Sequence, residues 1–148
     1  MLGIIRPGAW NLPLFLHVLG ATILFGTTAA VAIVGFASRS RTDYAALLSR
    51  VAMRTFLFGI VPGWILMRAG ASWILSKEYP HGASTPGWVN VGLVVSEGGG
   101  LVLLVMGILA WIWRRRGGTG ELGLVVPILA SICLAGFAVA WFAMSGKP

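Results

Sequence analysis

The chain has 148 residues, of which 57% are hydrophobic and only 10% are charged. Soluble domains carry about 25% charged residues, so this composition argues against a soluble enzyme or binding domain and indicates a membrane protein. The formal net charge is +7, but the basic residues flank long apolar runs. Basic residues in such positions set the orientation of membrane helices, so we expect the lipid bilayer as a partner and no nucleic acid.

Four apolar stretches are long enough to cross a bilayer, whose ~30 Å hydrocarbon core needs roughly 20 helical residues. We treat residues 1–148 as one domain, with spans at residues 12–37, 55–75, 88–113 and 122–144. The first run is longer than the core of a signal peptide, so we expect it to be retained as a helix. The short connections favour antiparallel neighbours, and the expected fold class is all-α, an integral membrane antiparallel four-helix bundle.

The second span contains features that shape a helix. Apolar residues recur at helical spacing from Tyr44 onward, so we expect this helix to begin outside the membrane and to run into it. Pro62 removes one backbone donor, which predicts a kink nearby. Gly59 and Gly63 form a GxxxG motif, a short pattern that membrane helices use for close packing.

The basic residues are divided unequally between the two sides of the membrane. Arg6, Lys77 and Lys147 fall on one side, and seven arginines fall in the connections on the other. Those seven are Arg39, Arg41, Arg50, Arg54, Arg114, Arg115 and Arg116. Because positive charge favours the cytoplasmic side, we expect both termini to lie outside, an N-out and C-out topology.

Three ionisable residues, His17, Arg68 and Glu97, lie inside the apolar stretches. A rise of ~1.5 Å per helical residue places them about 8, 10 and 14 Å from the outer ends of their spans. All three therefore fall within the outer half of the membrane, where we expect them to form one polar layer. Ionisable residues are rare within membrane spans and often mark functional sites.

Each of these residues has a structural and a functional interpretation. Arg68 and Glu97 can form an ion pair that fixes the register of two helices. Alternatively, Arg68 can hold an anionic ligand group while Glu97 takes part in a proton or cation step. His17 can bond to a neighbouring helix, or it can ligate haem or a metal ion. A haem held by two histidines would need His81, in the outer loop, as its second imidazole. His17, Arg68, Glu97 and His81 are therefore the candidates for cofactor binding, and His17 is the candidate metal ligand.

Motifs of enzyme chemistry are absent from the sequence. There is no Ser/His/Asp set, no HExxH motif, no P-loop and no pair of carboxylates, and the single Cys133 lies within an apolar run. Two classes of function remain. The first is a non-enzymatic membrane component or a subunit of a larger membrane complex. The second is a redox module that holds haem b or a quinone, or a protein that handles copper or another cation, at the outer polar layer.

The segment LHVLGATILFG, residues 16–26, resembles the first helix of the copper-resistance D-like superfamily of small bacterial membrane proteins. Members often open with a leucine–histidine pair and glycines along that helix, and a tryptophan opens the third span, as in PGWV here. The resemblance covers mainly the first helix and the four-span plan. It implies a multi-pass protein of the bacterial inner membrane, with copper handling or haem association in some relatives. Only His17 is carried over residue by residue.

Overall fold

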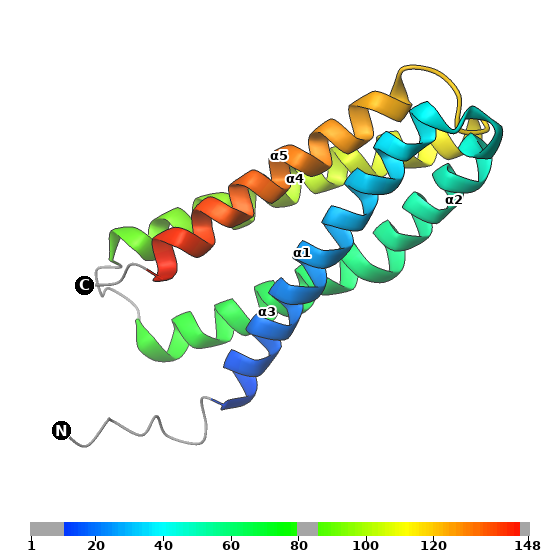
Figure 1. Cartoon of the computed structure of the whole chain (residues 1–148). Helices are drawn as coiled ribbons and strands as arrows, with labels where there is room; N and C mark the ends of the chain where they lie inside the picture. The colour runs from blue at the N-terminus through cyan, green and yellow to red at the C-terminus, as the bar shows by residue number, and fades with distance from the viewer. Residues whose placement is uncertain (1–10, 80–85, 146–148) are drawn as a thin grey trace.

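The structure is a computed structural model that describes residues 11–79 and 86–145, and within these ranges the chain forms helices and no strands. Figure 1 shows α1 (Asn11–Ser40), α4 (Gly87–Arg115) and α5 (Leu122–Ser145) as separate helices. The second span is continuous but has four parts, which are η2 (Thr42–Tyr44), α2 (Ala45–Thr55), the π-helical turn η3 (Phe56–Ile60) and α3 (Val61–Glu78). The all-α prediction is therefore confirmed.

Four helical stretches of the described chain are long and apolar enough to cross a membrane. They are residues Asn11–Ser40, Thr42–Glu78, Gly87–Arg115 and Leu122–Ala143. Each predicted span coincides with one of them to within a few residues, apart from the second. That stretch begins well before residue 55, as the helical spacing from Tyr44 predicted. The chain thus has the architecture of a multi-pass membrane protein, and its orientation in the membrane stays a prediction.

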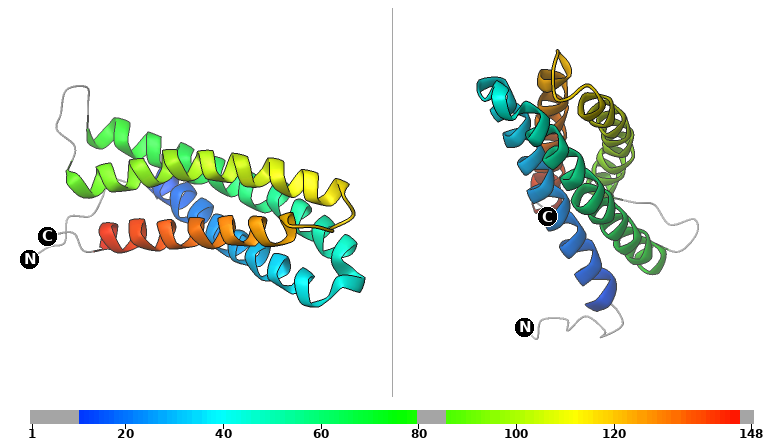
Figure 2. Two further views of the ribbon diagram at one scale, coloured as in Figure 1. Left: turned by 90° about the horizontal axis from the view of Figure 1, so that it is seen from above. Right: turned by 90° about the vertical axis from the view of Figure 1, so that its right-hand side faces the viewer.

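The helices form two pairs that meet at one end of the molecule and diverge toward the other. Helix α1 packs against α3 and α5, and α4 packs against α5 and α2. Figures 1 and 2 show that α1 and the α2 part of the second span converge with α4 and α5 near the connections at residues 41–44 and 116–121, whereas α1 and α3 diverge from α4 and α5 toward the other end. We call this the arginine-rich end. We call the opposite end, where α1 begins and α5 ends, the terminal end.

The apolar core lies where the pairs converge. Its fully buried side chains come from every span, and the largest include Trp113, Leu24, Ile60, Met106 and Val126. The terminal half of the molecule contributes few members to this cluster. Packing is therefore tightest in the arginine-rich half, and the ionisable residues of the spans lie in the looser half.

Glycines allow the backbones of α1 and α3 to touch. A Cβ atom on Gly20 would lie 2.7 Å from the carbonyl oxygen of Gly63, and one on Gly63 would lie 2.8 Å from the amide nitrogen of Leu24. Gly70 meets α1 in the same way, because its Cβ atom would lie 2.7 Å from the carbonyl oxygen of Pro13. The glycines of the GxxxG motif therefore do form a packing face, of the kind that holds membrane helices together by close van der Waals contact.

The irregular turn that Pro62 predicts lies just before the proline. Because Pro62 has no N–H, the carbonyl oxygen of Phe58 loses its usual helical donor. In the structure the preceding turn widens into the π-helical segment Phe56–Ile60, and the N–H of Val61 bonds to the carbonyl oxygen of Phe56. Figure 1 shows the span changing direction between α2 and α3.

Helix α4 is terminated by glycines in the left-handed conformation. Gly117 and Gly118 have φ values of 68° and 80°. The N–H of Gly118 donates to the carbonyl oxygen of Trp113 at 3.0 Å, and that of Gly117 donates to Arg114 at 3.1 Å, which is a Schellman cap. Gly118 also packs against the backbone of Ala45. The cap therefore places the start of α2 beside the end of α4.

We predict that Gly20→Ala destabilises the protein, because the added methyl group would force the α1 and α3 backbones apart. Overpacking of this kind costs about 1–3 kcal/mol, which exceeds the ~1 kcal/mol that alanine gains over glycine in a helix. The matched control is Gly26→Ala on the same helix, where a Cβ atom would meet nothing within 4 Å. Thermal unfolding in detergent should show a lower Tm for Gly20→Ala and an unchanged or higher Tm for Gly26→Ala. Equal Tm values for both variants would contradict the close contact.

Candidate functional site

An ion pair joins the two diverging helix pairs. Nη2 of Arg68 on α3 contacts Oε1 of Glu97 on α4, and Nη1 of Arg68 donates to Oγ of Ser72 at 3.2 Å. The backbones of α3 and α4 otherwise stay apart along most of their length. The structure therefore brings together the arginine and the carboxylate that the sequence singled out. A role for them in ligand binding stays a prediction.

The Glu97 side of this pair is open. The Arg68 side chain is 28% exposed, and that of Glu97 is 62% exposed. Its neighbours on α4 are uncovered too, because Val94 is 71% and Leu101 is 68% exposed, and a Cβ atom on Gly98 would meet nothing within 4 Å. We call these four residues, Val94, Glu97, Gly98 and Leu101, the Glu97 face. It is an apolar strip of α4 with one carboxylate in its middle.

Two polar atoms beside the ion pair are buried and lack a hydrogen-bond partner among the described residues. They are Nε1 of Trp64, one turn before Arg68, and Oγ of Ser96, next to Glu97. The Trp64 ring lies across Gly100, whose Cβ atom would be 3.0 Å from Cζ2 of that ring. A buried polar group without a partner costs about 1–3 kcal/mol. The polar layer is therefore incompletely satisfied by the chain itself.

His17 lies at the same level along the helices as the ion pair, but it takes part in the α1–α3 contact and not in the bridge between α3 and α4. Its Nδ1 is 3.0 Å from the carbonyl oxygen of Met67, the residue before Arg68. A carbonyl oxygen only accepts hydrogen bonds, so Nδ1 of His17 is the donor in this contact. His17 is thus bonded to a neighbouring helix in the structure, and its role as a haem or metal ligand stays a prediction. The three residues share a level, as their depths predicted, but His17 bonds within the α1–α3 contact and the ion pair bridges α3 and α4.

The remaining candidates add little to this layer. His81 lies outside the described residues. In the part of the chain that the structure describes, no group of three or more His, Cys, Asp or Glu side chains gathers in a metal-binding arrangement. Cys133 is buried within the apolar core, where it fills space as a small side chain.

Three residues of the polar layer were not among the candidate site residues named from the sequence. Trp64 and Ser72 lie four residues on either side of Arg68 and so share its face of α3. Ser96 adjoins Glu97. The spacing of four could have identified Trp64 and Ser72, but only the packing shows that the Trp64 and Ser96 atoms have no partner.

Comparisons with protein-family models, with curated proteins and with solved structures find no match for this chain. The fold and the four apolar spans define its class, a multi-pass membrane protein. The likeness to the copper-resistance D-like superfamily stays a prediction.

We predict that Arg68 and Glu97 are energetically coupled. Arg68→Met and Glu97→Leu should each lower the Tm in detergent, because each leaves an unpaired charge in a poorly solvated layer. The double variant should recover much of the loss, since neither charge then remains. Residues in contact typically show a coupling free energy of about 0.5–3 kcal/mol in a double-mutant cycle.

Arg116→Met with Glu121→Leu provides the matched control cycle. Both residues are exposed at the arginine-rich end and form no ion pair with each other in the structure. Their coupling should be close to zero. A coupling near zero for Arg68 and Glu97 as well would show that the bridge does not contribute to stability.

Proposed function

We propose that the protein is a non-enzymatic subunit of a membrane complex, and that its Glu97 face docks a transmembrane helix of a partner subunit. The observation that carries this proposal is the exposure of Glu97, at 62%, in the middle of an apolar span. Exposure of an apolar side chain there needs no explanation, because lipid covers it. Exposure of a carboxylate does.

The position of Glu97 makes lipid an unfavourable neighbour. It lies ten residues after Gly87, the first residue of α4, which is roughly 15 Å along the helix at ~1.5 Å per residue. A charged residue at the centre of a membrane helix costs ~2.5–3.5 kcal/mol on insertion scales. Arg68 reduces this cost but contacts only one side of the carboxylate. A partner helix over the Glu97 face would remove the contact with lipid.

The shape of the Glu97 face suits a helix. Gly98 has open space where a side chain would project, so a partner backbone could approach closely at this point. The flanking Val94 and Leu101 would supply apolar contact above and below. Membrane helices associate through this combination of small residues and a polar group that forms hydrogen bonds.

We predict that a photo-crosslinking amino acid at Val94 or Leu101 forms a covalent product with a second polypeptide in intact membranes. Val139 is the control, since it is 60% exposed but lies on α5, away from the Glu97 face. The mass of the product on a denaturing gel shows whether the partner is a different protein or another copy of this chain. Products of equal yield from Val139, or no protein product from either α4 position, would contradict the docking face.

A second candidate function rests on the hydrogen bond of His17. A histidine that ligates a metal usually donates its other ring N–H to a carbonyl oxygen or carboxylate, as Nδ1 of His17 does to Met67. Nε2 would then hold a haem iron, which would supply one-electron redox chemistry. Among the described residues His17 is the only imidazole, so a second histidine ligand would have to be His81.

An absorption spectrum tests the haem candidate. Protein purified in detergent from haem-replete cells should show a Soret band, and His17→Ala should abolish it. Arg41→Ala, at the opposite end of α1, should retain it. A colourless wild-type protein would remove haem binding and leave the subunit proposal unaffected.

A further inference from the structure

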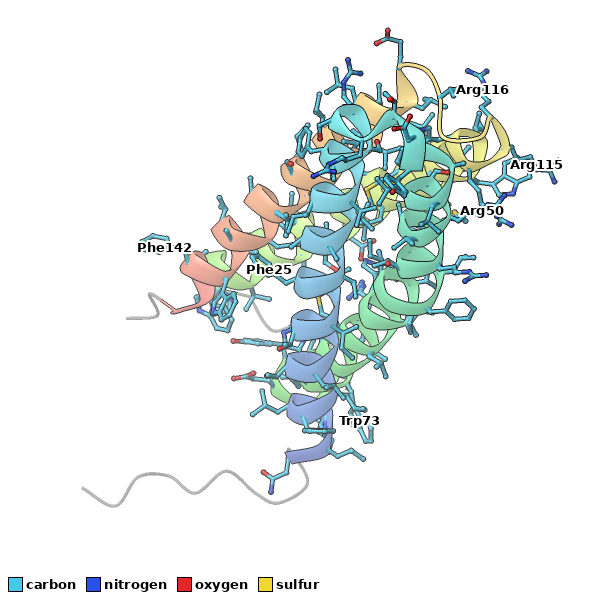
Figure 3. All side chains as sticks on the ribbon, turned by 45° about the vertical axis from the view of Figure 1, so that its right-hand side comes forward. Phe25, Arg50, Trp73, Arg115, Arg116 and Phe142 are labelled. Atoms are coloured by element: carbon cyan, nitrogen blue, oxygen red, sulfur yellow. The ribbon has the colours of Figure 1, made fainter. Side chains whose placement is uncertain are left out.

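The arginine-rich end contains a basic hollow between α2 and α4. Its volume is about 410 Å³, and its lining residues are Arg50, Arg54, Trp111, Arg114 and Arg115. Figure 3 shows Arg50 on α2 and Arg115 on α4 at this same end of the molecule. Arg50 and Arg54 are one helical turn apart, so both reach the hollow from the same face of α2.

Among the described residues, the four guanidinium groups have no counter-charge. No carboxylate of the described residues lies within ion-pair distance of any of them. The guanidinium carbon of Arg115 lies 4.4 Å from the centre of the Trp111 ring, and this cation–π contact restrains one of the four charges in place. Four positive charges that lie together, one of them restrained by an aromatic ring, favour the binding of an anionic ligand.

An apolar hollow adjoins the basic one and extends it toward the middle of the spans. Its volume is about 230 Å³, and its lining residues are Met53, Phe56, Leu104, Gly107, Ile108 and Trp111. Trp111 lines both hollows, and from there the apolar lining continues along α4 to Leu104, about two turns deeper. Within this lining the Phe56 ring rests against Gly107. A ligand that fills both hollows must be anionic at one end and apolar at the other.

We propose that these two hollows together bind an anionic glycerophospholipid, with its phosphate at the arginines and an acyl chain in the apolar hollow. The forked guanidinium group matches the geometry of phosphate oxygens. Basic pockets between membrane helices are recognised sites for anionic headgroups. Since four arginines exceed the charge of one phosphodiester, a lipid with two phosphates binds more tightly than a lipid with one.

The apolar hollow distinguishes a lipid from a soluble phosphate compound. A free phosphate or nucleotide would satisfy the arginines but would leave the surface from Met53 to Leu104 uncovered. That surface lies within stretches long and apolar enough to span a membrane, where acyl chains are the most abundant apolar ligand. This inference does not depend on the proposed subunit role, because the Glu97 face and the two hollows share no residue.

The experiment uses the full-length protein in nanodiscs. Phosphatidylcholine alone is compared with phosphatidylcholine containing phosphatidylglycerol or cardiolipin, and retained lipid is counted by native mass spectrometry. We expect preferential retention of phosphatidylglycerol, stronger retention of cardiolipin, and a higher Tm with either. The double variant Arg50→Gln, Arg54→Gln should lose at least fivefold in retained anionic lipid. The control Arg39→Gln, Arg41→Gln removes the same charge from the same end outside the hollow and should change retention less than twofold.

Headgroup probes without chains separate a lipid from a simple anion. Inorganic phosphate and glycerophosphoglycerol, added to phosphatidylcholine nanodiscs, should leave the Tm unchanged. The proposal is overturned if these soluble anions raise the Tm as much as phosphatidylglycerol does. It is also overturned if wild-type protein retains phosphatidylcholine and phosphatidylglycerol equally, or if both double variants lose retention to the same extent. The wild-type comparison decides the question even if the Arg50→Gln, Arg54→Gln variant does not fold.

Discussion

The backbone contact between α1 and α3 is the constraint from which the rest of the arrangement follows. Gly20, Gly63 and Gly70 bring the two helices so close that no side chain fits between them at these points. The widened turn at Phe56–Ile60 redirects the second span, so that α2 packs against both α1 and α4 whereas α3 packs against α1 and stays apart from α4. Helix α3 therefore diverges from α4, and only long side chains such as that of Arg68 can cross the separation.

The features that the sequence predicted correctly are those that depend on one helix alone and not on its neighbours. Hydropathy and length locate the four spans, helical spacing from Tyr44 shows that the second begins early, and Pro62 marks the irregular turn. The rise per residue also placed Arg68 and Glu97 at matching levels, and the structure joins them. Each of these predictions uses the distance along one helix axis, which the number of residues determines directly.

The features that the sequence did not predict depend on which helices become neighbours. A charge within a membrane span is expected to face other helices. Glu97 instead lies on an open surface, because α3 packs along α1 and leaves α4 uncovered at this level. The level of His17 was predicted correctly, but its hydrogen bond to Met67 turns it toward a different contact from that of Arg68. Rotation about a helix axis, unlike depth, is set by the packing of the whole chain, so one sequence alone does not determine it.

Both halves of the molecule carry charges that the protein itself does not fully neutralise. Four helices cannot enclose every charge that their sequence carries, so some charges must be matched by the surroundings. At the arginine-rich end one of the four charges, that of Arg115, lies against the Trp111 ring, beside an apolar hollow. At the level of Glu97 the membrane offers no comparable anion or cation, and Arg68 satisfies only part of the carboxylate. We therefore propose that lipid completes the first site and that a polar group on another membrane helix completes the second.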